Sequence, residues 1–352
     1  MRRKKEFLIK CASLILAILA SIFVASIFLY VCGLNPATAW QVIAYGAVGS
    51  RHNMSESMVV AIPLMLAGLG VGFAFKCGVW NIGAEGQLYM GAVGASAAAL
   101  YLPCPAPWHL IVVMLAAVLV GGGWAVIPGM LKMKLKVNEI LTTLMMNYIA
   151  IWIVHYLVYG PWRSLKEINP QTAFFPTSTW LPILVPRSRL HAGLLIGLIC
   201  AVFMYVVFRY TKLGYNIKVV GTNPKAAQYG GISVSKTVIV AMFISGGLAG
   251  LAGMGELCGI HHYLRDGIYR ISPGYGYISI GAALLGGLNA WGIVIASIFI
   301  GCLFNGVSYL KTMVGSEYLH ANAPQLIVGV LILAVLAKGI FVKRLMPKGK
   351  EN

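Results

Sequence analysis

Apolar runs long enough to cross a bilayer as a helix recur from one end of this chain to the other. Ten runs of roughly 20 residues are apparent, about the length of helix that spans the hydrocarbon core. We therefore expect helices near residues 7–31, 58–75, 82–102, 109–131, 139–160, 190–210, 237–258, 275–289, 291–311 and 325–342. Hydrophobic residues make up 59% of the chain and charged residues 10%, too few to cover the surface of a water-soluble protein.

The predicted fold class is all-α. The apolar runs are unbroken Leu, Ile, Val and Ala, whereas the strands of a membrane barrel alternate polar and apolar residues. We expect a polytopic protein of about ten transmembrane helices, forming a single transmembrane domain over residues 1–352. The basic and then apolar start resembles a signal peptide, but it is too long and lacks a small-residue cleavage site. We interpret 7–31 as a retained, peripheral first helix.

The basic residues predict the orientation of the chain. Counted from a cytoplasmic N terminus, 19 of the 27 Lys and Arg residues fall in segments expected inside and 8 in segments expected outside. By the positive-inside rule, both termini lie in the cytoplasm. The net charge of +18 is spread over these segments instead of gathering in one patch, so we expect the lipid bilayer as its partner and no nucleic acid.

The sequence lacks the motifs of an enzyme or a metal site. Its seven Cys are widely spaced with no CxxC pair, and it has no GxxxxGK[ST] phosphate loop, no metal-spaced His pair and no GxSxG turn. We expect no catalytic residue, no metal and no cofactor in this chain, which leaves transport as the main class of function.

A polar segment interrupts the apolar pattern at "KCGVWNIGAEGQLYMG", residues 76–91. A charged Glu85 inside a span costs about 2.5–3.5 kcal/mol on insertion scales, and Asn81 and Gln87 lie close to it in the sequence. One interpretation is a broken helix start that lines a water-filled path. The other is a structural Glu that fixes the packing of neighbouring helices. The sequence leaves both open.

A second interrupted segment, "SPGYGYISIGAALLGGLNAWG" at residues 272–292, lies in a corresponding place. If 58–160 and 237–342 are two inverted halves, each half contains one short or broken helix, a pattern typical of a transport pathway at the repeat interface. Tight helix packing by small residues is the alternative. The candidate residues of the path or its supporting shell are Asn81, Glu85, Gln87, Tyr89, Tyr275 and Tyr277. The aromatic rings could stack on a planar base or a sugar, although interfacial aromatic belts have the same composition.

The polar loop 211–236 predicts one short helix at the membrane surface. Asn223 followed by Pro224 is typical of an N-cap and the first helical position, and Gly230 with Gly231 predicts the stop. We expect one helix, at about 224–229, because the other glycines argue against a longer one.

Three motifs together resemble a known family. "FKCGVWNIGAEGQ", "GYNIKVVGTNPKAAQYGGISVSK" and "GYGYISIGAALLGGLNAWG" are similar to the membrane permeases of ABC importers of the ribose and branched-chain amino-acid type, most closely the nucleoside and simple-sugar permeases. The resemblance implies that the 211–236 loop carries the coupling helix that docks on an ATPase. Its docking residues would be Gly221, Asn223, Pro224, Ala226, Ala227, Tyr229 and Gly230.

The same resemblance implies the partners and the substrate. ATP and Mg would bind in a separate cytoplasmic ATP-binding subunit, next to a second permease subunit, identical or related, and an extracytoplasmic substrate-binding lipoprotein at a bacterial cell (inner) membrane. Nucleosides are the expected substrate, with a simple sugar of the ribose type as the alternative. A different class is an ion- or proton-coupled secondary transporter, in which Glu85 would carry the ion.

Overall fold

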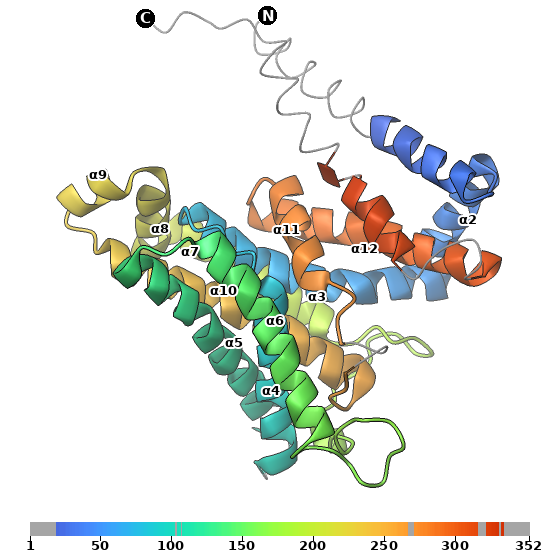
Figure 1. Ribbon diagram of the computed structural model, residues 1–352, viewed down its shortest axis with the longest axis horizontal. Helices are drawn as coiled ribbons and strands as arrows, with labels where there is room; N and C mark the ends of the chain where they lie inside the picture. Colours follow the sequence, from blue (N-terminus) through green and yellow to red (C-terminus); the bar gives the residue numbers. More distant parts are fainter. Residues whose placement is uncertain are drawn as a thin grey trace, which may run out of the picture. The chain divides into compact units, whose positions relative to one another are not determined.

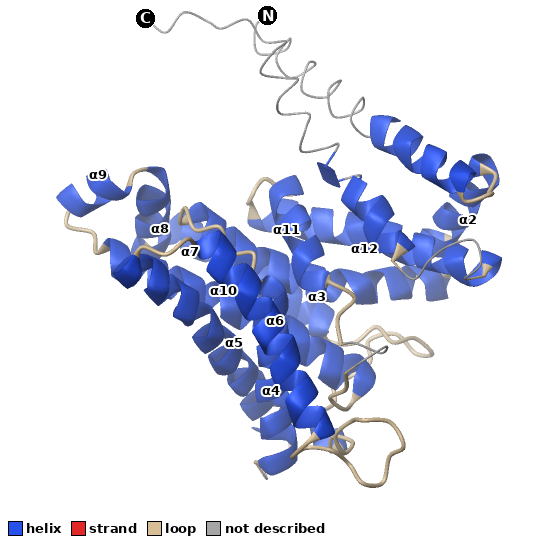
Figure 2. Cartoon of the chain, viewed as in Figure 1, coloured by secondary structure: helices blue, strands red, loops and turns tan. Residues whose placement is uncertain are grey.

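The structure, a computed structural model, describes residues 19–102, 104–106, 108–266, 271–315, 322–330 and 332–333. Within these ranges the regular secondary structure is helical, joined by loops that contain two isolated β-bridges (Figure 2). The helices are Leu19–Val31, α2 (Pro36–Val48), α3 (Arg51–Lys76), α4 (Ala84–Tyr101), α5 (Trp108–Leu135), α6 (Glu139–Tyr159), η1 (Thr177–Thr179), α7 (Gly193–Tyr210), α8 (Lys212–Thr222), α9 (Pro224–Tyr229), α10 (Val234–Glu256), η2 (Leu257–His261), α11 (Tyr275–Leu285) and α12 (Ala290–Val314). Residues 323–330 are helical as well.

The expected all-helical membrane fold is confirmed at this level. Six of the described helices are long and apolar enough to cross a membrane, or up to seven if the pair Leu19–Val31 and α2, bent by 112°, is one span. The expected span 325–342 and the first part of 7–31 fall largely outside the described residues. The count of ten helices and the two inverted halves stay predictions.

Two helical segments depart from the expected pattern. α2 is not among the helices expected from the sequence. Asn35 caps it by accepting a hydrogen bond from the Ala37 amide, and Pro36 begins it. Likewise, α8 is a second helix in the loop where one is expected. Its glycines allow close packing instead of turns: a Cβ at Gly214 would lie 2.1 Å from the carbonyl oxygen of Val207.

The described chain divides into two compact units, one of residues 1–57 with 302–352 and one of residues 58–301 (Figure 1). In the first unit, Asn305 joins α12 to the preceding helices. Its side-chain amide donates hydrogen bonds to the carbonyl oxygens of Gly46 and Asn53, at 3.0 and 3.1 Å, and to the Ser57 hydroxyl.

In the second unit, α4 and α10 are central. Glycines let them approach closely: a Cβ at Gly91 would lie 2.1 Å from the Cα of Gly250, and one at Gly253 would lie 2.1 Å from the Leu88 carbonyl oxygen. The most apolar window of α10 is 78% buried within the chain, whereas those of α5, α6 and α7 are only 28%, 22% and 28% buried. The outer faces of α5, α6 and α7 are therefore open to lipid or to another subunit.

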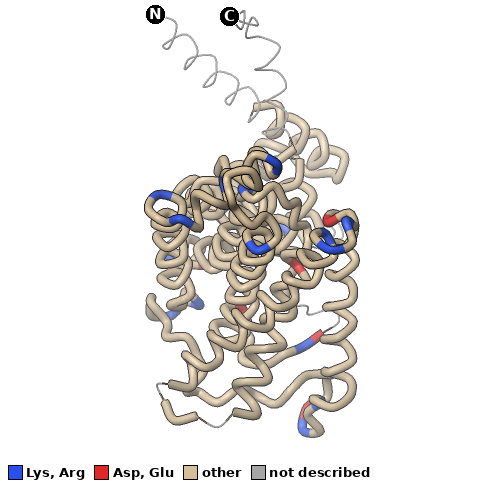
Figure 3. The backbone as a smooth tube through the Cα atoms, turned by 90° about the vertical axis from the view of Figure 1, so that its left-hand side faces the viewer, with Lys and Arg blue, Asp and Glu red and all other residues tan. Residues whose placement is uncertain are grey.

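Basic residues gather at one end of this second unit. α3, α5 and α7 each carry Lys or Arg in their last turn, where a cation complements the helix dipole. Figure 3 shows Lys and Arg concentrated near the ends of the helices, with few along their length. α8 and α9 lie at this same end, because Gly221 packs on the backbone of Lys76 and Cys77.

Candidate functional site

The polar segment forms a break between α3 and α4. The chain leaves the helical path at Cys77, turns at Gly78 with a positive φ of 74°, and becomes helical again at Ala84. Asn81 stabilises this break, because its Oδ1 accepts a hydrogen bond from the Gly83 amide at 3.0 Å. Residues 77–83 thus connect two helices, and the broken helix start along a path stays a prediction.

Asn81 and Gln87 are locked to each other. Each side-chain amide donates to the other's carbonyl oxygen at 2.9 Å, and Asn81 also donates to the hydroxyl of Ser245 on α10 at 2.9 Å. All three residues are buried. The side-chain polar atoms of Asn81 and Gln87 are therefore bonded within the protein, as buried polar groups generally are.

α6 supplies the second clamp on the break. The Asn147 carbonyl oxygen accepts from the Gly86 amide at 2.8 Å, while its amide group donates to the Ile82 carbonyl oxygen at 2.9 Å and to the Tyr277 hydroxyl at 3.1 Å. Thr143 also accepts, from the Ile82 amide at 3.2 Å. Asn147, Thr143 and Ser245 are not among the site residues expected from the sequence. The sequence does contain a signal for Asn147, because an amide side chain inside an apolar run indicates a structural or functional role.

Glu85 links the two interrupted segments. Its carboxylate accepts a hydrogen bond of 2.7 Å from the Gly276 amide, in the first turn of α11. The backbones touch here, since a Cβ at Gly276 would lie 2.3 Å from the Glu85 amide nitrogen. A carboxylate at the positive end of a helix dipole is favourable, which gives this buried acid a structural reason.

The three candidate tyrosines differ in exposure. Tyr89 and Tyr275 are 1% and 8% exposed and belong to the packed interior. Tyr277 is 37% exposed, and its hydroxyl accepts a hydrogen bond from the Asn147 side-chain amide. Of the six residues expected along the path, Tyr277 has a partly exposed side chain, whereas Asn81, Glu85, Gln87, Tyr89 and Tyr275 are buried.

The short helix α9 begins and ends where the sequence predicts. Asn223 caps it by accepting from the Ala226 amide at 3.1 Å, and Gly231 adopts a positive φ of 78° just beyond Gly230. Tyr229 is 94% exposed, whereas Ala227 is fully buried against its own chain. Of the residues expected to dock, Asn223, Pro224, Ala226, Tyr229 and Gly230 face outward and Ala227 does not.

α8 connects α9 to the break. A Cβ at Gly221 would lie 2.0 Å from the Lys76 carbonyl oxygen, so the end of α8 rests on the last turn of α3, directly before Cys77. A cavity of about 560 Å³ adjoins this contact and is lined by Gly78, Glu139, Gly221 and Pro224 among others. Lys132, which pairs with Glu139, also lines it. Among the residues that the structure describes, no group of three His, Cys, Asp or Glu is placed to hold a metal ion.

The fold is that of a multi-pass membrane protein, and the comparisons with known proteins agree. The family model described as "Branched-chain amino acid transport system / permease component" matches residues 53–336. The chain therefore belongs to this family of ABC transporter permeases, which are transport subunits and not enzymes, and which work with ATPase and substrate-binding partners.

Three relatives cover nearly the whole chain. It is similar to the glucose ABC transporter permease TsgB13 of Haloferax volcanii, with 34% identity over 93% of this chain and 87% of the relative. It is 31% identical to the guanosine ABC transporter permease NupP of Bacillus subtilis, over 96% of both chains. It is 29% identical to the nucleoside ABC transporter permease NupB of Lactococcus lactis, over 96% and 93%. No solved structure matches the chain significantly.

Proposed function

We propose that this chain is the permease subunit of an ATP-driven importer of nucleosides. The relatives NupP and NupB are named as guanosine and nucleoside permeases and align with almost all of this chain. The main support for the proposal is that the charged side chains at the site are bonded within the protein. The Glu85 carboxylate is bonded to the α11 backbone. Lys132, which donates to the Gly78 carbonyl oxygen in the break between α3 and α4, is paired with Glu139, so these charges are balanced within the protein.

The helix ends at the site favour a neutral solute over an amino acid. A helix N terminus can bind a substrate carboxylate through its backbone amides without any cationic side chain. Here those amides are occupied: Glu85 takes the Gly276 amide, Asn147 takes Gly86, and Asn81 takes Gly83. A nucleoside carries no charge and offers hydroxyls and a planar base.

Tyr277 is the proposed contact with the solute. Its ring is partly exposed and held in place by Asn147, and stacking of a base on an aromatic ring contributes about 1–3 kcal/mol in nucleic-acid complexes. Asn81, Glu85, Gln87, Tyr89 and Tyr275 form the supporting shell in this proposal. Two inverted halves, 58–160 and 237–342, would rock about this point in alternating access.

A simple sugar is the second candidate, because the relative TsgB13 is named as a glucose permease and is 34% identical to this chain. A sugar is also neutral and also stacks on tyrosine, so the contacts at the site fit both solutes. The two candidates differ in the planar base, and uptake in competition separates them.

The test is uptake of labelled guanosine by vesicles that contain this permease with its ATPase and binding protein. Unlabelled adenosine should compete, whereas ribose, glucose and leucine should not. Tyr277→Leu should weaken guanosine uptake more than the matched variant Tyr215→Leu, which changes an exposed tyrosine on α8. Competition by glucose or ribose without competition by adenosine would assign the sugar instead.

The proposal also covers the assembly. α9 is the proposed coupling helix, with Tyr229 as its most exposed side chain, and motion of α9 would pass through α8 and Gly221 to the break before α4. Both termini and the 211–236 loop would be cytoplasmic. A second permease subunit would cover part of the open faces of α5, α6 and α7, and a lipoprotein would deliver the solute from outside.

A further inference from the structure

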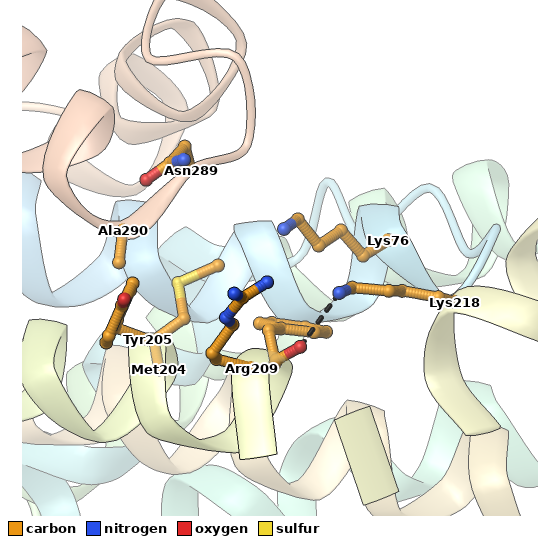
Figure 4. A pocket seen from close by; sticks show the side chains of 8 residues that line it. Lys76, Met204, Tyr205, Arg209, Lys218, Asn289 and Ala290 are labelled. Carbon is orange, nitrogen blue, oxygen red and sulfur yellow. Dashed lines mark hydrogen bonds between the residues drawn. The ribbon is translucent and has the colours of Figure 1, made fainter. Parts of the chain in front are cut away.

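A basic pocket lies at the end of the second unit that carries α8. Lys76 from the last turn of α3, Arg209 from the last turn of α7 and Lys218 from α8 line one cavity of about 140 Å³. Asn289 and Ala290, at the start of α12, complete its wall. Figure 4 shows the side chains of the three cations reaching the same space. Residues widely separated in sequence are therefore brought together here by the fold.

Phe208 holds the side chains of Lys76 and Lys218 in place. The Lys76 ammonium lies 4.3 Å from the centre of the Phe208 ring and that of Lys218 lies 5.8 Å from it. Lys218 also donates to the Phe208 carbonyl oxygen at 2.8 Å (Figure 4). Holding cations together in this way is unfavourable unless an anion shares the space.

The protein itself does not supply that anion within the residues described. None of the described residues lining the pocket is Asp or Glu, and Lys76, Arg209 and Lys218 form no ion pair with a described acidic side chain. The N terminus of α12 adds the positive end of a helix dipole to the same wall. Three cations and a helix N terminus match the charge and hydrogen-bonding needs of a phosphate group.

The surroundings favour a phosphate that carries acyl chains. Tyr205 lines the pocket, and the neighbouring face of α7 exposes apolar side chains at Ile199, Val202, Phe203 and Val206. α7 is one of the helices whose most apolar part is mainly open, at 28% buried. A free inorganic phosphate would use only the cations, whereas a phospholipid would also lay its chains along this apolar face.

We propose that this pocket binds the phosphate headgroup of an anionic phospholipid from the leaflet on the side of α8 and α9. Basic pockets between helices at a membrane surface are suited to such headgroups. The lipid would tie the ends of α3 and α7 to α8 and the start of α12. It would thereby stabilise the position of α8, the helix that leads into α9.

Lipid retention in native mass spectrometry tests this proposal on the full chain with any subunits that copurify. The sample is exchanged into phosphatidylglycerol or phosphatidylcholine with the same acyl chains. We expect selective retention of phosphatidylglycerol, which inorganic phosphate does not displace. Equal retention of both lipids by the unmodified protein overturns the proposal without any variant. Displacement by inorganic phosphate would assign a free-anion site instead and also overturn it.

Matched variants locate the site. Lys76→Gln with Lys218→Gln should lower phosphatidylglycerol retention about tenfold, because each basic residue near the surface contributes separately to binding. Lys212→Gln with Lys236→Gln removes the same charge from exposed positions at the same end and should change it little. Lys76→Arg with Lys218→Arg should retain the lipid. Equal loss in the two Gln pairs would mean that net charge, not the pocket, holds the lipid.

Discussion

At the scale of single residues, Glu85 illustrates how a buried acid is accommodated in this protein. Its carboxylate caps α11 through the Gly276 amide, so its charge offsets a helix end and is not left for solute. The structural interpretation of this residue therefore gains direct support from the geometry. An ion-coupled mechanism, by contrast, would need a carboxyl group that takes up and releases a proton or cation during each cycle.

Replacing Glu85 separates these two mechanisms. Glu85→Gln keeps an oxygen that accepts from Gly276, so we expect a folded protein with most of its uptake. Glu85→Ala leaves that buried amide without its acceptor and should lower the free energy of unfolding by about 1–3 kcal/mol. Thermal unfolding in detergent and uptake in vesicles measure both effects. Loss of uptake in a fully stable Glu85→Gln protein would instead favour ion coupling.

His191, in the loop before α7, makes stability depend on pH. Burial, aided by nearby His262, lowers its pKa to about 4, and its Nδ1 accepts from the Gly193 amide at 3.1 Å. In the unfolded chain the pKa is about 6.5. Between pH 4 and 6.5 the unfolded state therefore binds more protons than the folded state. The contribution of His191 to the free energy of unfolding is complete above pH 6.5 and falls by about 3 kcal/mol as the pH approaches 4.

The measurement is the unfolding temperature of the unmodified protein and of His191→Asn between pH 7.5 and 4.5. Asn keeps an oxygen near the position of Nδ1 but does not titrate, so the variant should lose part of the pH dependence. An unchanged slope would mean that His191 is not the group responsible.

At the scale of elements, α4 and α11 meet through backbone, and Gly276 makes that possible. Gly276→Ala would place a Cβ 2.3 Å from the Glu85 amide nitrogen, a contact that only a shift of one helix can relieve. We expect a loss of about 3 kcal/mol in stability. Gly123→Ala on α5, where nothing lies within 4 Å of an added Cβ, is the control and should be neutral or slightly stabilising. Similar unfolding temperatures for the two variants would contradict this contact.

The element α9 has its own test. Tyr229→Ala removes a side chain that is 94% exposed, so the fold should stay intact. If α9 docks on the ATPase, binding should weaken by about 2 kcal/mol, as for an aromatic anchor at an interface. Copurification of the ATPase and stimulation of its activity measure this loss. Tyr215→Ala on α8, 64% exposed, should have little effect; equal losses in both would argue against docking by α9 itself.

At the scale of the whole molecule, the distribution of Lys and Arg predicts a cytoplasmic 211–236 loop. In a variant without its seven native cysteines, Lys225→Cys should not react with an impermeant thiol reagent added outside intact cells. Lys166→Cys, exposed in the loop after α6, should react. Labelling in the opposite pattern would invert the proposed topology.

The sequence alone determined the features that depend on neighbouring residues. Apolar runs predicted the long helices because a membrane span must satisfy its own backbone over about 20 residues. α9 is predicted to the residue because its cap Asn223, its first residue Pro224 and its stop at Gly230 are local signals. The broken start of α4 follows from the polar and glycine residues between Asn81 and Gln87 for the same reason.

The tertiary structure alone decided which groups meet. The bond from Gly276 to Glu85 and the clamp from Asn147 to Gly86 join residues 191 and 61 positions apart. No local pattern encodes such contacts, because they depend on the path of the helices between them. The same holds for α8, where glycines that suggest turns in the sequence serve close packing on other helices. It holds for Ala227 too, which is buried because a helix six residues long must turn one side toward its own protein.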